Sequence, residues 1–495
     1  MKNNVRRLKL FREEDIQRIY NSALDILQRT GVRVREQTVV KALESAGCNV
    51  VGDQVRMPAS LVEEQLRKAP RRFNIYNRAG VEVIRIEEQN LYFQPMIGRL
   101  NILDLESGKK RRTNLDDVSR LIRIADALPN YKMLHSGAIM PHIEGIPDKI
   151  SHVYGYIAST INSSKVIKGT CRGRNKAIDC IQMASVICGG EEELRNRPNL
   201  FTTYNVISPL EHGREMLEGL TEYVKHGVPV DITSEPQMGA TSPITIAGTV
   251  AQQSAEVFSG VVIAQILSPG TPVFIGTCGA AMDMRYGVIS LGSIEAGLIN
   301  CAHAQIAKYC NIPSRGTGSN TQAKVLDFQA GYEKTLTLML AALAGINMLF
   351  YPGTIEHAET VSMESLVLDH EICSVANQCL GDIDVSDETL AVDIINKVGS
   401  GNSFLGEKHT LKHLQGECYM PRVSDYRKRS DWEKAGAEDI AQVAKTEVRR
   451  ILAEHKPLAM EASIAEQLLR IAREIEKRET KKNSKMLEAL FYDNK

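Results

Sequence analysis

The hydrophobic pattern of the first 95 residues changes from helical spacing to short alternating runs. Apolar side chains recur at the period of an amphipathic helix over residues 11–30. A second helix, a hairpin, a third helix and a set of alternating strand segments follow at 37–45, 49–58, 59–68 and 72–95. Residues 1–95 are therefore predicted to form a mixed α+β N-terminal module.

After residue 95, short apolar runs that are typical of buried strands alternate with longer helical segments. The strand-like runs lie at 97–103, 133–139, 165–170, 200–206, 229–233, 272–277, 312–316 and 346–351. The helical segments include 211–226, 250–267, 325–344 and 362–380. About eight strand–helix units predict an α/β fold of the TIM (β/α)8 barrel type over residues 96–381. An open doubly wound sheet is the structural alternative, because alternation alone does not fix closure.

The last part of the chain, residues 382–495, is more polar. A helix is expected at 386–398 and a long polar loop at 399–430. Two charged amphipathic helices are expected at 432–454 and 460–477. This loop and these helices are predicted to pack on the barrel as a C-terminal addition.

Charge and composition narrow the functional class. Lysine plus arginine and aspartate plus glutamate both number 60, so no overall field favours nucleic acid or an anionic membrane surface. The longest apolar runs, such as 338–346, are too short to span a bilayer. Ten cysteines are scattered without a disulfide framework, which indicates a reduced compartment. We therefore expect a soluble cytoplasmic protein with a small-molecule ligand.

Polar residues that end the strand-like runs are the candidate site, because a TIM barrel carries its reactive groups at the carboxyl ends of its strands. They are His135, Arg172, Tyr204, Asn205, Glu235, Tyr286, Arg315, Gln329, Glu333, Tyr351 and His357. Glu235 is the strongest candidate, since Pro236 favours extended backbone before it and Gly239 lets the backbone approach a ligand. Its alternative role is to cap the next helix or to pair with a neighbouring arginine.

Three tyrosines stand out in a chain with only 5% aromatic residues, namely Tyr204, Tyr286 and Tyr351. Aromatic faces at a barrel mouth hold a quaternary ammonium by cation–π attraction worth about 0.5–2 kcal/mol each. Half-buried loop packing is the alternative for any one of them. Gln329 and Glu333 share a helix face at i,i+4 spacing, and for Glu333 an ordinary contact between helices is the alternative.

Motifs for a metal or a nucleotide cofactor are missing. His409 and His413 have helical i,i+4 spacing but lack the glutamate of the zincin pattern. No C-x-x-C pair, dinucleotide fingerprint or Walker sequence occurs. We therefore expect no metal site and no tightly bound cofactor.

The loops that carry these candidates resemble a known family. The motifs are Glu235-Pro236 with Gly239-Ala240-Thr241 and Pro243, then Asp327-x-Gln329-Ala330-Gly331-Tyr332-Glu333, then Ala344-Gly345-x-Asn347 and Leu366-Val367-Leu368-Asp369-x-Glu371. In this order they resemble the trimethylamine methyltransferase superfamily, from the N-terminal module to the C-terminal helices. The resemblance implies a TIM barrel that moves a methyl group from a methylamine to the cob(I)alamin of a separate corrinoid protein.

The resemblance also points to a branch of that superfamily. The archetypal trimethylamine enzyme carries pyrrolysine in its barrel, whereas this sequence contains only standard residues. Members without pyrrolysine resemble glycine betaine and related quaternary-amine methyltransferases. The partners implied are a quaternary amine and a corrinoid protein, whose cobalamin is not held tightly by this chain, and the family forms homo-oligomers.

On this interpretation Glu235 is the catalytic residue, and the other ten candidates bind the substrate in an aromatic and amide-lined pocket around one carboxylate. Arg172, Arg315 or His357 would take a substrate carboxylate. The polar segment 399–430 would be a lid or docking surface, or simply a loop that ties the last helices to the barrel. Two alternatives stay open: a corrinoid-independent lyase or hydrolase with Glu235 as general base, and a non-catalytic barrel that binds a small amine.

Overall fold

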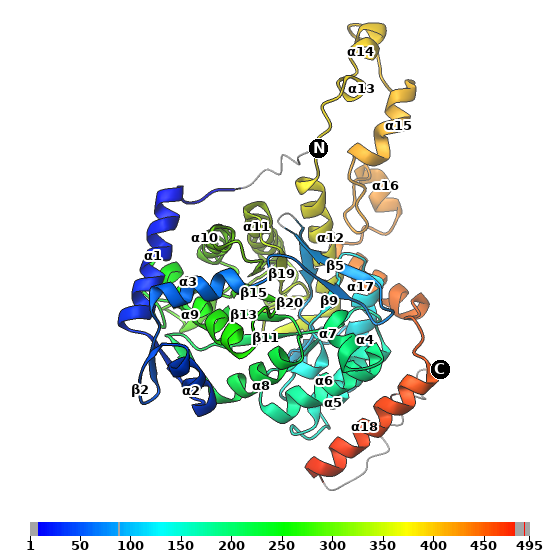
Figure 1. The fold of residues 1–495 in the computed structure, drawn as a ribbon. Coiled ribbons are helices and arrows are strands. Elements are labelled where there is room, and N and C mark those ends of the chain that lie inside the picture. Colours follow the sequence, from blue (N-terminus) through cyan, green and yellow to red (C-terminus); the bar gives the residue numbers. More distant parts are fainter. Residues whose placement is uncertain (1–7, 88–89, 481–489, 491–495) are drawn as a thin grey trace.

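Eight parallel strands form the centre of the protein. The computed structural model describes residues 8–87, 90–480 and 490, and the elements are drawn in Figure 1. In sheet order the strands are β6 (Tyr92–Gln94), β19 (Met348–Phe350), β18 (Ser314–Thr317), β15 (Val273–Thr277), β13 (Val230–Ser234), β11 (Leu200–Val206), β10 (Val166–Gly169) and β9 (Met133–Leu134). Parallel bridges from Phe93 to Tyr131 and from Met96 to His135 bring the two end strands together. The predicted barrel is confirmed, and the open doubly wound sheet is excluded.

The first barrel strand differs from the prediction. Residues 97–103 were expected to form it, but the strand beside β19 is β6. Residues 101–103 instead form β7 (Asn101–Leu103), in a small sheet with β8 (Lys110–Arg112), β20 (Thr354–Ile355) and β21 (Thr360–Ser362). Residues 92–94 lie in the stretch 72–95 that was predicted as strand segments of the N-terminal module, and a local alternating pattern does not show which sheet a segment joins. The other seven strands lie within or across the predicted runs.

A ring of helices covers the outside of the barrel, as the alternation predicted. The helices are α4 (Leu115–Ala127), α5 (Ser151–Ile161), α6 (Arg174–Cys188), α8 (Arg214–Lys225), α9 (Ile246–Leu267), α10 (Ile294–Cys310), α11 (Phe328–Ala344) and α12 (Met363–Leu380). Short elements lie between them, namely η1 (Gly137–Ile139) and α7 (Glu191–Asn196). Asp327 caps α11 by accepting a hydrogen bond from the Ala330 amide at 3.0 Å, which fixes where this helix begins.

Helix α9 is apolar on all sides, and its surroundings explain why. It is long and apolar enough to cross a membrane by length and composition, but 83% of its most apolar window is buried inside the protein. The N-terminal helices α1 (Glu13–Arg29), α2 (Gln37–Ser45) and α3 (Ala59–Lys68) pack against it on the side away from the strands. A helix that is covered by protein on both faces loses its polar stripe.

The N-terminal module also closes the bottom of the barrel. The hairpin of β4 (Phe73–Tyr76) and β5 (Glu82–Ile86) packs its apolar side chains on the first residues of several barrel strands. Phe73 meets Phe274 edge to face, with ring centroids 5.1 Å apart. A second small sheet, in the order β12 (Glu211–His212), β1 (Val32–Val34), β3 (Gln54–Arg56) and β2 (Asn49–Val51), joins the module to the barrel. The division of the chain at residues 95 and 381 stays a prediction.

The C-terminal part is more helical than expected. Its elements are α13 (Asp387–Leu390), α14 (Val392–Val398), α15 (Lys408–Glu417), α16 (Arg429–Lys434), α17 (Ile440–Glu454) and α18 (Ala462–Thr480). Helix α15 lies inside the predicted loop 399–430, and the predicted helix 432–454 is interrupted between α16 and α17. Helices α17 and α18 pack on the barrel helices, whereas α13 to α15 stand away from the barrel at the top of Figure 1.

Candidate active site

A cavity of about 500 Å³ opens at the carboxyl ends of the barrel strands. Residues from or just after seven of the eight strands line it, together with the loop that follows β6. The lining residues used below are Arg99, His135, Lys168, Arg172, Thr203, Asn205, Glu235, Cys278, Arg315, Phe350 and Tyr351. Because the β4–β5 hairpin closes the opposite end, this is the face on which a barrel places its chemistry.

Arg315 forms the floor of the cavity and is only 1% exposed. Its Nη1 donates to Cys278 Sγ at 2.9 Å and to Thr233 Oγ1 at 3.4 Å, and its guanidinium carbon lies 4.3 Å from the centre of the Phe350 ring. Its Nε is 3.4 Å from Asp231 Oδ2, yet Nε has no hydrogen-bond acceptor in the part of the chain that the structure describes. A buried guanidinium with an unmet N–H is a ready partner for an anionic ligand.

Asp231 supports Arg315 from the middle of β13. It is fully buried and accepts a hydrogen bond from Thr203 Oγ1 at 2.9 Å. Gly276, on the neighbouring strand β15, leaves the space that this carboxylate occupies, since a Cβ there would lie 2.5 Å from Asp231 Oδ1. The close approach of the two strands' inward side chains therefore requires glycine at 276.

Lys168 and His135 line the cavity beside Arg315. Lys168 is 4% exposed, and its Nζ lies 5.1 Å from the centre of the Phe350 ring. Burial, with a smaller contribution from Arg315, lowers the pKa of Lys168 to about 7. Burial also holds the pKa of His135 well below its ordinary value, and its Nδ1 accepts a hydrogen bond from the Gly98 amide at 3.2 Å. His135 is therefore a neutral imidazole at pH 7.

Tyr351 follows β19 in a left-handed backbone conformation, with φ of 98°. A tyrosine pays a steric penalty for such a φ, so the surrounding structure must hold it there. Its ring centre lies 4.6 Å from that of Phe350, and the guanidinium carbon of Arg99 lies 5.8 Å from it. Its hydroxyl points toward Cys278 Sγ at 3.8 Å. These two aromatic rings form one wall of the cavity.

The rim of the cavity is exposed and polar. Glu235 directly follows β13, is exposed and lines the cavity, and its negative charge acts on Cys278 and Tyr351. Asn205 of β11 and Arg172 after β10 are also exposed. The cavity is therefore open to solvent on the side where its negative charge lies.

Six of the eleven predicted residues come together in this cavity. They are His135, Arg172, Asn205, Glu235, Arg315 and Tyr351. They come from six different strand ends that are far apart in the sequence, so barrel closure alone unites them.

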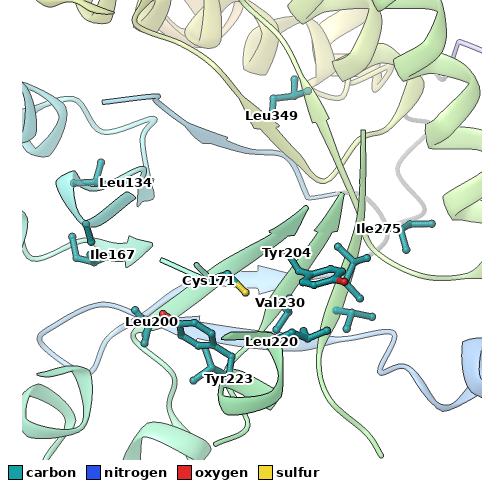
Figure 2. Packing of buried hydrophobic residues seen from close by; sticks show 14 of the residues in the cluster. Leu134, Ile167, Cys171, Leu200, Tyr204, Leu220, Tyr223, Val230, Ile275 and Leu349 are labelled. Atoms are coloured by element: carbon teal, nitrogen blue, oxygen red, sulfur yellow. The ribbon is translucent and has the colours of Figure 1, made fainter. Parts of the chain in front are cut away.

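Two predicted tyrosines lie elsewhere. Tyr204 is fully buried on the outer side of β11, where its hydroxyl bonds His212 Nδ1 at 2.7 Å, and it belongs to the apolar cluster drawn in Figure 2. Adjacent strand residues point to opposite faces, so Asn205 and Tyr204 could not both face the cavity. Tyr286 is 75% exposed in the turn between β16 (Ala280–Asp283) and β17 (Val288–Ser290), under the guanidinium of Arg285. Neither lines the cavity, contrary to the prediction.

Gln329, Glu333 and His357 also lie outside the cavity. Glu333 Oε2 accepts hydrogen bonds from Thr321 Oγ1 at 2.7 Å and from the Gln322 amide at 2.8 Å, and Gln329 Nε2 donates to its Oε1 at 2.9 Å. His357 is tied to the same loop through its backbone amide, which donates to Thr321 O at 3.1 Å. The alternative of an ordinary structural contact therefore describes Glu333, because its carboxylate is fully used in holding the 321–322 loop.

The floor contains residues that the sequence analysis missed, chiefly Lys168, Asp231, Cys278 and Phe350. Two of them could have been found in the sequence, because Lys168 and Asp231 are charged residues inside short apolar strands. A charge that is buried in this way needs a partner or a function. The floor is consequently cationic, with Arg99, Lys168 and Arg315 facing one buried carboxylate. The predicted aromatic and amide-lined pocket around a single carboxylate does not describe it.

The described residues contain no group of three or more histidine, cysteine, aspartate or glutamate side chains that could hold a metal ion. His409 and His413 lie with ring centres 4.4 Å apart, and His413 Nε2 is 3.3 Å from Glu388 Oε1.

Comparison with known proteins decides the family. The model of the family described as trimethylamine methyltransferase matches residues 1–481. A glycine betaine methyltransferase of Desulfitobacterium hafniense (strain Y51) is 33% identical over 453 residues, which are 91% of this chain and 94% of that protein. The trimethylamine methyltransferase MttB of Desulfitobacterium hafniense (strain DSM 10664 / DCB-2) is 32% identical over 470 residues, 94% of each chain.

The chain belongs to the trimethylamine methyltransferase family. Its structure agrees with this, since a solved hydroxylamine complex of MtmB superimposes with a TM-score of 0.50 over 92% of this chain and 96% of that one, at 12% identity. That likeness concerns the fold alone. The resemblance inferred from the loop motifs is confirmed, and the protein is a methyltransferase of this family.

In this methyltransferase, replacing Gly276 with alanine is expected to disturb the floor. The new methyl group would overlap Asp231 and Thr233, so the unfolding free energy should fall by about 1–3 kcal/mol and the KM for substrate should rise. Gly331→Ala is the matched control, because a Cβ at 331 meets nothing within 4 Å and the residue lies on the exposed face of α11. That control should be neutral or stabilising by up to about 1 kcal/mol. Urea unfolding of both variants measures the difference, and equal stability would contradict the packing argument.

Proposed function

We propose that this protein transfers a methyl group from a quaternary amine that also carries a carboxylate, such as glycine betaine, to the cob(I)alamin of a separate corrinoid protein. Family membership supports the methyl transfer, and the similar proteins include both a glycine betaine and a trimethylamine methyltransferase. Of the substrates named for these two relatives, glycine betaine has a carboxylate and trimethylamine has none. The charges in the cavity favour a substrate with a carboxylate.

The observation that carries the proposal is the unmatched cation in the floor. Arg315 is buried with an N–H that lacks an acceptor, Lys168 lies beside it, and Asp231 is the carboxylate that faces both. A substrate with only a positive charge would be repelled by this floor. A zwitterion with its carboxylate on Arg315 and Lys168 would supply the missing anion and would leave its ammonium pointing to the mouth, where Glu235 lies.

The same orientation aligns the reacting atoms. Cob(I)alamin is a strong nucleophile, and a quaternary nitrogen departs as a neutral tertiary amine, so the leaving group needs no acid while the carbon–nitrogen bond breaks. The protein's residues then have to bind the zwitterion, exclude water and hold one N-methyl toward the mouth. Phe350 and Tyr351 supply an aromatic wall for the other methyl groups. Glu235, at the rim, would attract the ammonium without enclosing it.

The remaining parts of the proposal concern partners and location. A corrinoid protein would dock transiently over the open mouth, and the chain would form homo-oligomers as a family trait. The projecting segment of α13 to α15, which includes most of 399–430, is the proposed docking surface. All ten cysteines are free, which supports a reduced cytoplasmic setting.

A panel of amines with free cob(I)alamin, kept reduced by titanium(III) citrate, tests the proposal. Loss of cob(I)alamin absorbance is expected with glycine betaine, and kcat/KM should be at least about 100-fold lower with choline, which has the same trimethylammonium but no carboxylate. Equal rates for the two, or a signal with trimethylamine alone, would overturn the carboxylate assignment. Turnover without cobalamin would favour the lyase or hydrolase alternative, and binding without transfer would favour the non-catalytic one.

A further inference from the structure

Lys168 is a buried lysine whose Nζ donates no hydrogen bond to any residue that the structure describes, although Asp231 acts on its charge through space. Binding the substrate carboxylate uses its charge but not its proton. It lies on β10, the third strand of the barrel in chain order, and lines the cavity while being 4% exposed. Its Nζ lies over the Phe350 ring, 5.1 Å from the ring centre.

The other buried lysine near the strand ends shows how unusual this is. Lys334 donates to Ser319 O, Thr354 O and Asp369 Oδ2 at 3.1, 2.7 and 2.8 Å, so its charge is fully compensated. Lys334 thus acts as a structural group. A buried lysine with no such compensation is destabilising unless it serves a ligand or a reaction.

The titratable and charged groups that face Lys168 come from every strand end around it. They are Arg99 after β6, His135 after β9, Asp231 in β13, Cys278 after β15, Arg315 in β18 and Tyr351 after β19. Asp231 is the buried carboxylate among them, and it already pairs with Arg315 and Thr203. Glu235, at the rim of the same cavity, adds a second negative charge that acts on Cys278 and Tyr351. The ammonium of Lys168 is therefore the group in the floor that can lose its proton most readily.

The proposed reaction needs a proton at this place. When the nucleophile takes the methyl carbon, the electron pair of the carbon–nitrogen bond stays on nitrogen, and an alkyl amine of ordinary basicity binds a proton at neutral pH. An amine that stays unprotonated in the cavity keeps the lone pair with which it can take the methyl group back. Each turnover in the forward direction therefore consumes one proton.

We propose that Lys168 donates this proton to the tertiary amine product inside the cavity. The inference rests on the proposed function. Because the methyl group leaves toward the mouth, the amine first inverts at nitrogen, which turns its lone pair toward the floor. The Nζ–H bond then breaks with its electron pair left on Nζ, and the proton forms a bond with that lone pair. Neutral Lys168 then takes a proton from water through the open mouth. Because neutral lysine no longer attracts the carboxylate, the same step weakens the hold on the product and favours its release.

The other groups in the floor are poor donors. The guanidinium of Arg315 does not give up a proton in proteins. Burial raises the pKa of Tyr351 well above its ordinary value and also raises that of Cys278, so both hold their protons firmly. His135 is neutral at pH 7 for the reason given above. Lys168, whose pKa burial lowers to about 7, is the remaining candidate.

Lys168→Arg separates proton donation from charge, since arginine keeps the positive charge but cannot donate. With saturating glycine betaine and excess free cob(I)alamin, steady-state turnover should fall about 10-fold or more, while a first turnover is still seen as a burst. KM is expected to change as well, because Lys168 also contacts the substrate carboxylate, so the readout is the ratio of the first-turnover rate to the steady-state rate. Lys168→Ala should lose both substrate binding and turnover, and added methylammonium should restore turnover in proportion to its concentration. Melting temperatures of both variants check that they fold.

The pH dependence of wild type gives a test without any variant. Turnover at saturating glycine betaine should fall about tenfold per pH unit above the pKa of Lys168 in the complex, because neutral lysine has no proton to donate, whereas the first-turnover rate should not fall. In Lys168→Arg this fall should disappear. Steady-state turnover of Lys168→Arg equal to wild type from pH 7 to 10, or wild-type turnover that is flat over this range, would overturn the proposal. Failure of the proposed function would look different, as wild type would then methylate no cobalamin at all.

Discussion

Arg315→Lys is expected to raise the KM for glycine betaine by about 100-fold while leaving the protein folded. The loss corresponds to about 2.7 kcal/mol, the size of a charge-assisted pair with a carboxylate. Lysine keeps a positive charge for Asp231, so the buried carboxylate stays paired. It loses the planar fork that reaches Cys278, Thr233 and the substrate together. Steady-state kinetics with cob(I)alamin measures the effect.

The substrate without a carboxylate makes this prediction specific. Choline is expected to be an equally poor substrate for wild type and Arg315→Lys, so the preference for glycine betaine should shrink by the same 100-fold or so. Arg285→Lys is the matched control, because Arg285 pairs with Asp283 in an exposed turn outside the cavity. A KM for glycine betaine that rises less than threefold in Arg315→Lys would show that the carboxylate does not bind there.

Lys334→Met is expected to be the most destabilising single change, lowering the unfolding free energy by about 3–5 kcal/mol. Methionine fits the volume but removes three hydrogen bonds, two to backbone carbonyls and one to Asp369. Asp369 would remain fully buried with a charge that lacks its cation, although the Gly353 amide and Ser365 still donate to it. Equilibrium unfolding in urea measures the loss.

A second substitution shows whether the stranded charge is the cause. Lys334→Met combined with Asp369→Leu should recover part of the lost stability, because no buried charge is then left alone. Lys68→Met is the control, since Lys68 pairs with Glu64 on an exposed helix face and its removal should leave the urea midpoint unchanged. If the double variant were less stable than Lys334→Met alone, the account of Lys334 as the counterion of Asp369 would be wrong.

Lys334 also connects stability to the site. Two of its three partners, Ser319 and Thr354, lie in the segments that follow β18 and β19, and these strands carry Arg315 and lead into Tyr351. Tyr351 is held with φ of 98°, a conformation that a loosely packed loop would release. A cation and an aromatic wall that must hold one methyl group in line need such a rigid support.

The barrel was predictable because its periodicity is repeated. Seven of the eight strand positions follow from apolar runs that recur between helical segments, and the capped start of α11 follows from Asp327. The strand β6, Tyr92–Gln94, falls in the stretch 72–95 that was predicted as strand segments of the N-terminal module, and only its hydrogen bonds to β19, more than 250 residues away, place it in the barrel. Helix α15 was missed because its sequence is polar and it lacks a core-facing stripe.

The sequence predicted which strand ends form the candidate site, but it did not predict which side chains there face the cavity. Six candidates lie in the cavity because barrel geometry places strand ends together whatever their residues are. The prediction for Tyr204 was wrong because neighbouring strand residues point to opposite faces, and Tyr204 points to the outer side of β11. The prediction that Glu333 lines the cavity was wrong because its carboxylate accepts hydrogen bonds from a loop that begins twelve residues earlier in the chain. Only the folded chain brings this loop and the helix together.

The sequence by itself determined the βα alternation, the family and the strand ends at which polar groups lie, because each of these depends on local pattern or on motifs in order. Only the tertiary structure decided that the floor is cationic and that, among the residues the structure describes, Arg315 Nε has no hydrogen-bond acceptor and Lys168 Nζ donates no hydrogen bond. The physical reason is that the net charge and the hydrogen bonds of the cavity floor depend on groups from several strands. No single segment of the sequence shows which of these groups will meet.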